Sequence, residues 1–96
     1  MADLIFSPRF VGALEQVFEF VAELEPDRAP DQAQLILDGL EVLRTHPMIG
    51  RPVDQEMREL VLGSGRRCYL TLYRYFPSTD RVLALTVRHA RQAGYR

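Results

Sequence analysis

The spacing of apolar residues changes once along the chain, and this change restricts the fold more than any other feature of the sequence. From Phe10 to Leu43 apolar residues recur every three or four positions, as on the buried side of amphipathic helices. From Met57 to His89 the period becomes two, as in strands that bury one face. A helical half followed by a strand-forming half is typical of the α+β class.

Prolines and capping residues divide the helical half into two helices. A short apolar segment, residues 4–6, predicts a strand before them. Ser7, followed by proline, is expected to cap the first helix, and Pro26 is expected to end it. Asp27 is expected to cap the second helix, which ends near His46. Because the link is short, the two helices should form an antiparallel hairpin.

The second half predicts three strands joined by turns of hairpin length. The expected strands are Met57 to Leu62, Cys68 to Phe76 and Arg81 to His89. Ninety-six residues are too few for two domains, so residues 1–96 should form one. The predicted fold is therefore α+β, with a short N-terminal strand and an antiparallel helical hairpin packed on a small antiparallel β-sheet.

The side of the sheet that faces the helices is partly readable from the alternation. In the last strand Leu83, Leu85 and Val87 are expected on the core side. In the middle strand, leucines such as Leu70 alternate with tyrosines such as Tyr69, and either set can be buried. The residues alone leave this choice open.

Charge is distributed unevenly, although the formal net charge is only −1. Residues 1–48 carry nine acidic residues and three arginines, a net charge of −6, whereas residues 49–96 carry four acidic residues and nine arginines, a net charge of +5. Lysine is absent. The arginines either hold an acidic or phosphate-bearing partner, for which their planar group is suited, or form ordinary solvated faces.

The composition does not favour a metal site, a disulfide or a bound cofactor. One cysteine, Cys68, cannot form an internal disulfide, and with two histidines it does not make a zinc site. Cys68 is expected to be a buried structural thiol, and His46 a residue of the helix end. We expect no cofactor and no metal. The chain has no apolar stretch long enough to span a membrane, and its start does not resemble a signal peptide, so we expect a cytoplasmic protein.

The segment 86–96 has the highest density of chemically capable side chains. Arg88 suits phosphate binding, and His89 and Tyr95 can exchange the proton in RNA cleavage by the 2′-hydroxyl. These three residues are therefore candidate catalytic groups for a nuclease. The alternative interpretation is a basic strand end that is solvated or pairs with an acidic partner.

The order of elements and several local motifs resemble the RelE/ParE toxin superfamily of type II toxin–antitoxin modules. The resemblance covers nearly the whole chain, and the Gly-Arg-Pro loop followed by Arg-Glu-Leu-Val is its most specific part. The residues that carry it are Phe6-Ser7-Pro8, the loop 46–52, Met57 to Val61, Tyr69 to Arg74, and Arg88 to Tyr95.

This resemblance implies a growth-inhibiting toxin held inactive by an antitoxin that is encoded beside it. One branch of the superfamily cleaves messenger RNA on the ribosome, and the other poisons DNA gyrase. The nuclease branch places basic residues on the sheet face opposite the helices. The matching positions here are Glu59, Val61 and Leu70, none of them basic, and a carboxylate repels RNA phosphates.

The same resemblance puts the tyrosines of the middle strand in the core and leaves an apolar face flanked by arginines. Such a face suits an acidic amphipathic segment of the antitoxin, in a hetero-oligomer. The candidate antitoxin- or target-binding residues are Leu70, Leu72, Arg74, Arg88 and Arg91.

Three hypotheses follow. The first is a ParE-like toxin that acts by protein contact, with DNA gyrase as its target. The second is a ribosome-dependent messenger RNA endonuclease that uses Arg88, His89 and Tyr95. The third is a degenerate module that binds its antitoxin without being toxic.

Overall fold

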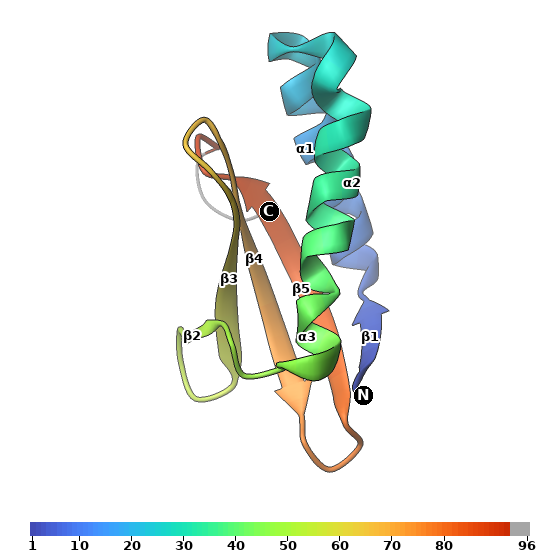
Figure 1. Ribbon diagram of the computed structural model, residues 1–96, viewed down its shortest axis with the longest axis vertical. Helices are drawn as coiled ribbons and strands as arrows, with labels where there is room; N and C mark the ends of the chain where they lie inside the picture. Colours follow the sequence, from blue (N-terminus) through green and yellow to red (C-terminus); the bar gives the residue numbers. More distant parts are fainter. Residues whose placement is uncertain (93–96) are drawn as a thin grey trace.

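A computed structural model describes residues 1–92 and shows a helical layer on one face of a five-stranded sheet (Figure 1). The elements are β1 (Asp3–Phe6), α1 (Pro8–Leu24), the 3-10 turn η1 (Pro26–Arg28), α2 (Ala29–Leu40), α3 (Val42–Thr45), β2 (Arg51–Pro52), β3 (Met57–Ser64), β4 (Arg67–Phe76) and β5 (Arg81–His89). The predicted α+β fold is confirmed. Within the described part of the chain, no helix has the length and apolar character needed to cross a membrane.

The sheet has the order β1-β5-β4-β3-β2, and its centre is the predicted antiparallel meander. It is not wholly antiparallel, however, because β1 pairs with β5 in parallel, with Ile5 opposite Leu83. Parallel neighbours need a long connection, and residues 7–80, which include the helices and the strands β2, β3 and β4, lie between β1 and β5. At the other edge β2 pairs with β3, with Arg51 opposite Glu59.

The start of α1 agrees with the prediction, whereas the start of α2 does not. The backbone N–H of Phe10 donates to Ser7 Oγ (3.0 Å), so Ser7 is the N-cap. Asp27 does not cap α2, because it lies inside η1. The helix begins at Ala29, and Arg28 at its N-cap makes no side-chain capping bond. Proline in the first turn of α2 explains the shift, since the φ angle of proline is fixed near the helical value and favours a helix start at this position.

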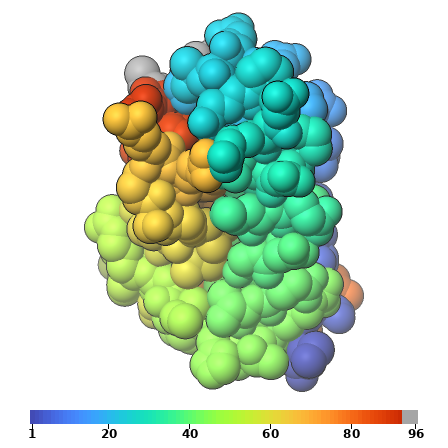
Figure 2. Space-filling view, turned by 45° about the horizontal axis from the view of Figure 1, so that its top comes forward, coloured from blue at the N-terminus to red at the C-terminus, as the bar shows by residue number. Residues whose placement is uncertain are grey.

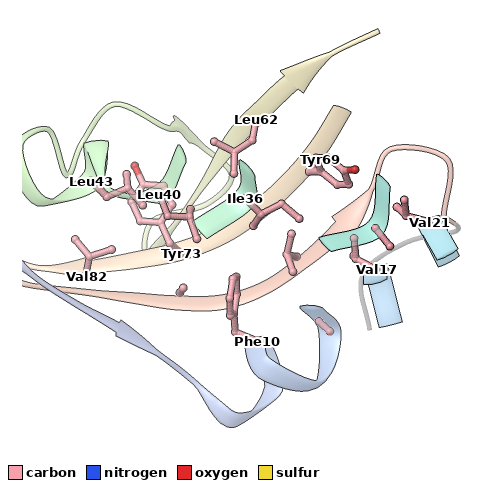
Figure 3. Close-up of a cluster of buried hydrophobic side chains, with 14 of the residues drawn as sticks. Phe10, Val17, Val21, Ile36, Leu40, Leu43, Leu62, Tyr69, Tyr73 and Val82 are labelled. Atoms are coloured by element: carbon pink, nitrogen blue, oxygen red, sulfur yellow. The ribbon is translucent and has the colours of Figure 1, made fainter. Parts of the chain in front are cut away.

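The tyrosines of β4, not its leucines, lie under the helices. Tyr69, Thr71 and Tyr73 are fully buried, while the leucines between them are half-buried on the other face. Burial raises the pKa of Tyr69 and Tyr73, and both hydroxyls have partners. Tyr69 Oη donates to Gln32 Oε1 (2.7 Å), and Tyr73 Oη accepts from the N–H of Gly50 (2.8 Å). Both rings point into the core of Figure 3.

A bulge in β5 changes which of its residues face the helices. Tyr73 pairs with Ala84 but Leu72 pairs with Thr86, so Leu85 is an extra residue. Ahead of the bulge Val82 and Ala84 face the helices and are buried, and after it Val87 and His89 do so; Thr86 is also fully buried, although it pairs with Leu72 of the other face. The prediction was right for Val87 and wrong for Leu83 and Leu85, which are half-buried, because one extra residue reverses the alternation.

The loop before β3 is built around Gly50. A Cβ atom there would lie 2.6 Å from Tyr73 Cε1, so only glycine lets the backbone approach this ring. Arg58 Nη1 donates to the carbonyl oxygens of Gly50 (2.7 Å) and Met48 (3.0 Å), which fixes the loop on β3. These contacts give the Gly-Arg-Pro motif a structural role, because the loop positions Arg51 at the edge of the sheet, opposite Glu59.

Candidate functional site

The face of the sheet that the helices leave uncovered is the first candidate site. Cross-strand neighbours share a face, so the register defines its members. We call the following part of it the open sheet face: Glu59 and Val61 of β3, Leu70, Leu72 and Arg74 of β4, and Thr86 and Arg88 of β5, of which Thr86 is fully buried. Its centre is apolar, since Val61 is 52% exposed and directly opposite the half-buried Leu70. Arg74 of β4 lies toward one end of this face, and Arg88 of β5, which pairs with Leu70, lies toward the other.

Two charged residues of this face, Glu59 and Arg74, are engaged with side chains beside it. Arg51 donates to Glu59 Oε1 through both Nε (3.0 Å) and Nη2 (2.8 Å), and the Glu59 side chain is only 10% exposed. Arg74 Nη1 lies 3.6 Å from Glu56 Oε2, and its guanidinium stacks 4.4 Å from the centre of the Phe76 ring. The face therefore combines an apolar centre with a neutralised carboxylate.

Arg88 and His89 are consecutive, and the structure places them on opposite faces of the sheet. Arg88 Nη1 donates to the carbonyl oxygens of His89 (3.4 Å), Ala90 (3.3 Å) and Gln92 (2.9 Å), so its guanidinium shapes the turn after β5. His89 faces the helices instead and is 4% exposed. The third candidate catalytic residue, Tyr95, lies outside the described residues.

The His89 ring uses both of its nitrogens to hold backbone. Its Nδ1 accepts from the N–H of Arg91 (3.0 Å), so the proton is on Nε2, which donates to the carbonyl oxygen of Arg66 (2.9 Å). The ring also lies 5.2 Å from the rings of both Phe20 and Tyr69. Burial lowers the pKa of His89 below its usual 6.5, with a smaller contribution from the Arg91 charge.

A pH-dependent stability follows from this lowered pKa. Below about pH 6.5 the unfolded chain binds a proton on His89 while the folded chain does not, so stability present above that pH is lost as the pH falls toward the folded-state pKa. We expect the protein to lose more stability between pH 7.5 and 5.5 than the His89→Gln variant. Urea unfolding at both pH values measures this. Equal losses in the two proteins would contradict the role of His89.

The remaining predicted site residue, Arg91, lies on the helix side, away from the open sheet face. It lines a cleft of about 480 Å³ between the end of α1 and the β3–β4 turn, together with Arg66 of that turn and Arg67 at the start of β4. Tyr69 and His89 line the same cleft. Sequence reasoning missed Arg66 and Arg67, although their position directly after a Gly-Ser-Gly turn marks them as tip residues of a hairpin.

Other residues singled out in the sequence have structural places. Cys68 is half-buried at the start of β4 rather than fully buried as expected. His46 is the C-cap of α3, and its Nδ1 lies 2.9 Å from Thr45 Oγ1. Among residues 1–92 no group of three His, Cys, Asp or Glu side chains is arranged to hold a metal ion.

A helical hairpin on one face of this sheet, with the other face open, is the α+β architecture that the RelE/ParE resemblance implies. A family described as the ParE toxin of the type II toxin–antitoxin system, parDE, matches residues 4–94. "Toxin RelE3" of Caulobacter vibrioides is 31% identical over 90 residues, covering 94% of this chain and 96% of that protein. The chain therefore belongs to the ParE toxin family and is the toxin of a type II toxin–antitoxin system.

A solved structure shares the fold. It is described as the chromosomal ParDE TA system from P. aeruginosa, and one of its chains superposes with a TM-score of 0.77 over 93% of this chain and 96% of its own. The two sequences are 17% identical, so the likeness concerns the fold alone.

Proposed function

We propose that this toxin arrests growth by protein contact with DNA gyrase rather than by cleaving RNA. The open sheet face carries the proposal, because its positions that match the nuclease branch hold Glu59, Val61 and Leu70. RNA binding draws most of its affinity from neutralised phosphates. Two apolar side chains and a carboxylate already paired with Arg51 supply no such neutralisation.

The state of His89 supports the same proposal. A general base in RNA cleavage needs a free nitrogen within reach of the 2′-hydroxyl. Both nitrogens of His89 hold backbone groups, and the sheet separates its ring from Arg88. A transferring phosphate on either face therefore meets only one of these two side chains.

The partner that silences the toxin is, in this proposal, an antitoxin bound through an acidic amphipathic segment. Leu70, Leu72 and Val61 offer apolar area, and Arg74 and Arg88 supply positive charge toward the two ends of the face. A disordered segment that folds on such a surface gains both kinds of contact. The complex is a hetero-oligomer in the cytoplasm.

One observation favours a second candidate function. The relative with 31% identity is named Toxin RelE3, and RelE-like toxins are the nuclease branch. In that case a ribosome-dependent endonuclease uses Arg88, His89 and Tyr95, with the ribosome as its target. Messenger RNA 5′ ends mapped in arrested cells separate the two functions, since cuts in phase with codons occur only with the nuclease.

Expression of the chain alone tests toxicity itself. We expect colony counts to fall by about a hundredfold or more after induction in a bacterial host, and to recover when the antitoxin encoded beside the toxin is co-expressed. Immunoblotting of the soluble fraction serves as the control for expression. Unimpaired growth with abundant soluble protein would instead identify a degenerate module that binds an antitoxin without being toxic.

A further inference from the structure

The cleft beside His89 is rich in positive charge. It opens between the end of α1 and the β3–β4 turn, and His89 at the end of β5 also lines it. Figure 2 shows this end of the molecule, where the end of β5 (red) lies between the β3–β4 turn (dark yellow) and the helices (blue to cyan). Arg66, Arg67 and Arg91 line it, and Glu25 is the one acidic residue among the described lining residues.

The three arginines are incompletely neutralised by the fold. Arg67 Nη2 lies 3.4 Å from Glu25 Oε1, a pair that is partly exposed on both sides. No carboxylate among residues 1–92 lies within ion-pairing distance of Arg66 or Arg91. The described lining residues thus carry two positive charges in excess, those of Arg66 and Arg91, and both side chains are exposed.

His89 holds Arg66 and Arg91 at the same cleft. Its ring binds the carbonyl oxygen of Arg66 and the N–H of Arg91, which belong to segments 25 residues apart in the chain. Both contacts use backbone atoms, so they leave the two guanidinium groups available to a ligand. Because the ring is buried and packed between Phe20 and Tyr69, it fixes the spacing of these segments. His89 is thereby a positioning residue.

We propose that this cleft binds acidic side chains of the antitoxin and is a second anchor, separate from the open sheet face. The inference rests on the proposed antitoxin partnership and adds the place where its carboxylates are held. Guanidinium groups bind carboxylates through paired, charge-assisted hydrogen bonds. Leu24, which is 57% exposed at the cleft, offers apolar contact to neighbouring residues of the same segment.

Two features favour a peptide carboxylate over a small phosphate-bearing ligand. Glu25 lies on the cleft and repels a phosphate monoester, with its charge of nearly two, more strongly than a single carboxylate. The exposed Leu24 also extends the surface beyond the arginines, as an amphipathic chain requires.

One segment can reach both anchors. Leu70 and Arg88 of the open sheet face are the immediate neighbours in sequence of Tyr69 and His89, which line the cleft. Only the thickness of the sheet separates the two surfaces at this end. β2 pairs with β3 at residues 58 and 59, and among residues 1–92 no other strand covers the edge of β3 around which the segment would pass.

The double variant Arg66→Ala, Arg91→Ala tests the proposal by calorimetric titration with the antitoxin encoded beside the toxin, at about 150 mM salt. We expect an affinity at least about tenfold weaker than that of the unchanged toxin. The fold should be retained, because His89 contacts only the backbone of these residues. Thermal unfolding of the variant verifies this.

The control variant is Arg44→Ala, Arg81→Ala, which removes the same charge far from the cleft, and we expect its affinity to change less than about twofold. An Arg66/Arg91 variant that binds as tightly as the unchanged toxin overturns the second anchor while the antitoxin partnership stands. Equal weakening of both variants also overturns it, since general electrostatics then explains the effect. If the unchanged toxin forms no complex, the proposed partnership itself fails.

Discussion

Replacing Tyr73 by alanine is expected to lower the free energy of unfolding by about 3–5 kcal/mol. The side chain is fully buried between β4 and the helices, so its loss leaves a large cavity (Figure 3). Its hydroxyl also accepts a hydrogen bond from the N–H of Gly50, and the substitution leaves this N–H without that partner. In a chain of 96 residues, whose total stability is small, such a loss leaves little folded protein at 37 °C.

Urea unfolding measures this loss of stability. One further variant separates the contribution of the hydroxyl from that of the ring, and a second serves as a control. Tyr73→Phe keeps the ring and removes only the hydrogen bond to Gly50, so about 1–3 kcal/mol is expected. Tyr75→Ala is the matched control, because Tyr75 lies on the same strand and face but is half-buried and bonded to the exposed Asp80. If Tyr75→Ala destabilises as much as Tyr73→Ala, the central position of Tyr73 is refuted.

The double variant Leu70→Glu, Leu72→Glu should bind the antitoxin at least about a hundredfold more weakly. Both leucines lie on the open sheet face, where two carboxylates must be desolvated against an apolar surface and repel an acidic segment. A hundredfold change corresponds to about 2.7 kcal/mol of binding free energy. The two leucines are half-buried on the uncovered face, so folding should be affected less than binding.

Calorimetric titration measures the affinity, and the control is the double variant Val11→Glu, Phe18→Glu. These residues are 48% and 40% exposed on α1, so the control adds the same charge to an apolar surface elsewhere. We expect the control to bind within about threefold of the unchanged toxin. A Leu70/Leu72 variant that binds no worse than this control would remove the open sheet face from the antitoxin interface.

Local signals made the element order predictable, whereas pairing across the sheet was not. Ser7 and Pro26 bound the first helix because capping and proline act on their immediate neighbours. The parallel pairing of β1 with β5 joins residues about 80 positions apart, and no short-range pattern encodes it. The bulge at Leu85 is equally hidden, since Leu83, Leu85 and Val87 form an uninterrupted alternation in the sequence.

The candidate sites were likewise predictable where local signals place a residue, and not where contacts between distant segments do. The resemblance of β4 to the family correctly placed the tyrosines in the core and Leu70 on the outer face. Arg88 and His89 looked like one catalytic group because they are adjacent, but side chains of consecutive strand residues point apart. The His89 ring links the backbone of Arg66 to that of Arg91, a contact that no spacing along the chain reveals.

DNA gyrase incubated with plasmid DNA and the purified toxin gives the most direct test of how the toxin acts. If the toxin works by protein contact with gyrase, covalent gyrase–DNA cleavage complexes accumulate as its concentration rises, and a molar excess of antitoxin abolishes them. If gyrase stays unaffected by toxin that is folded and arrests growth in cells, gyrase is not the target and the proposed mechanism is contradicted.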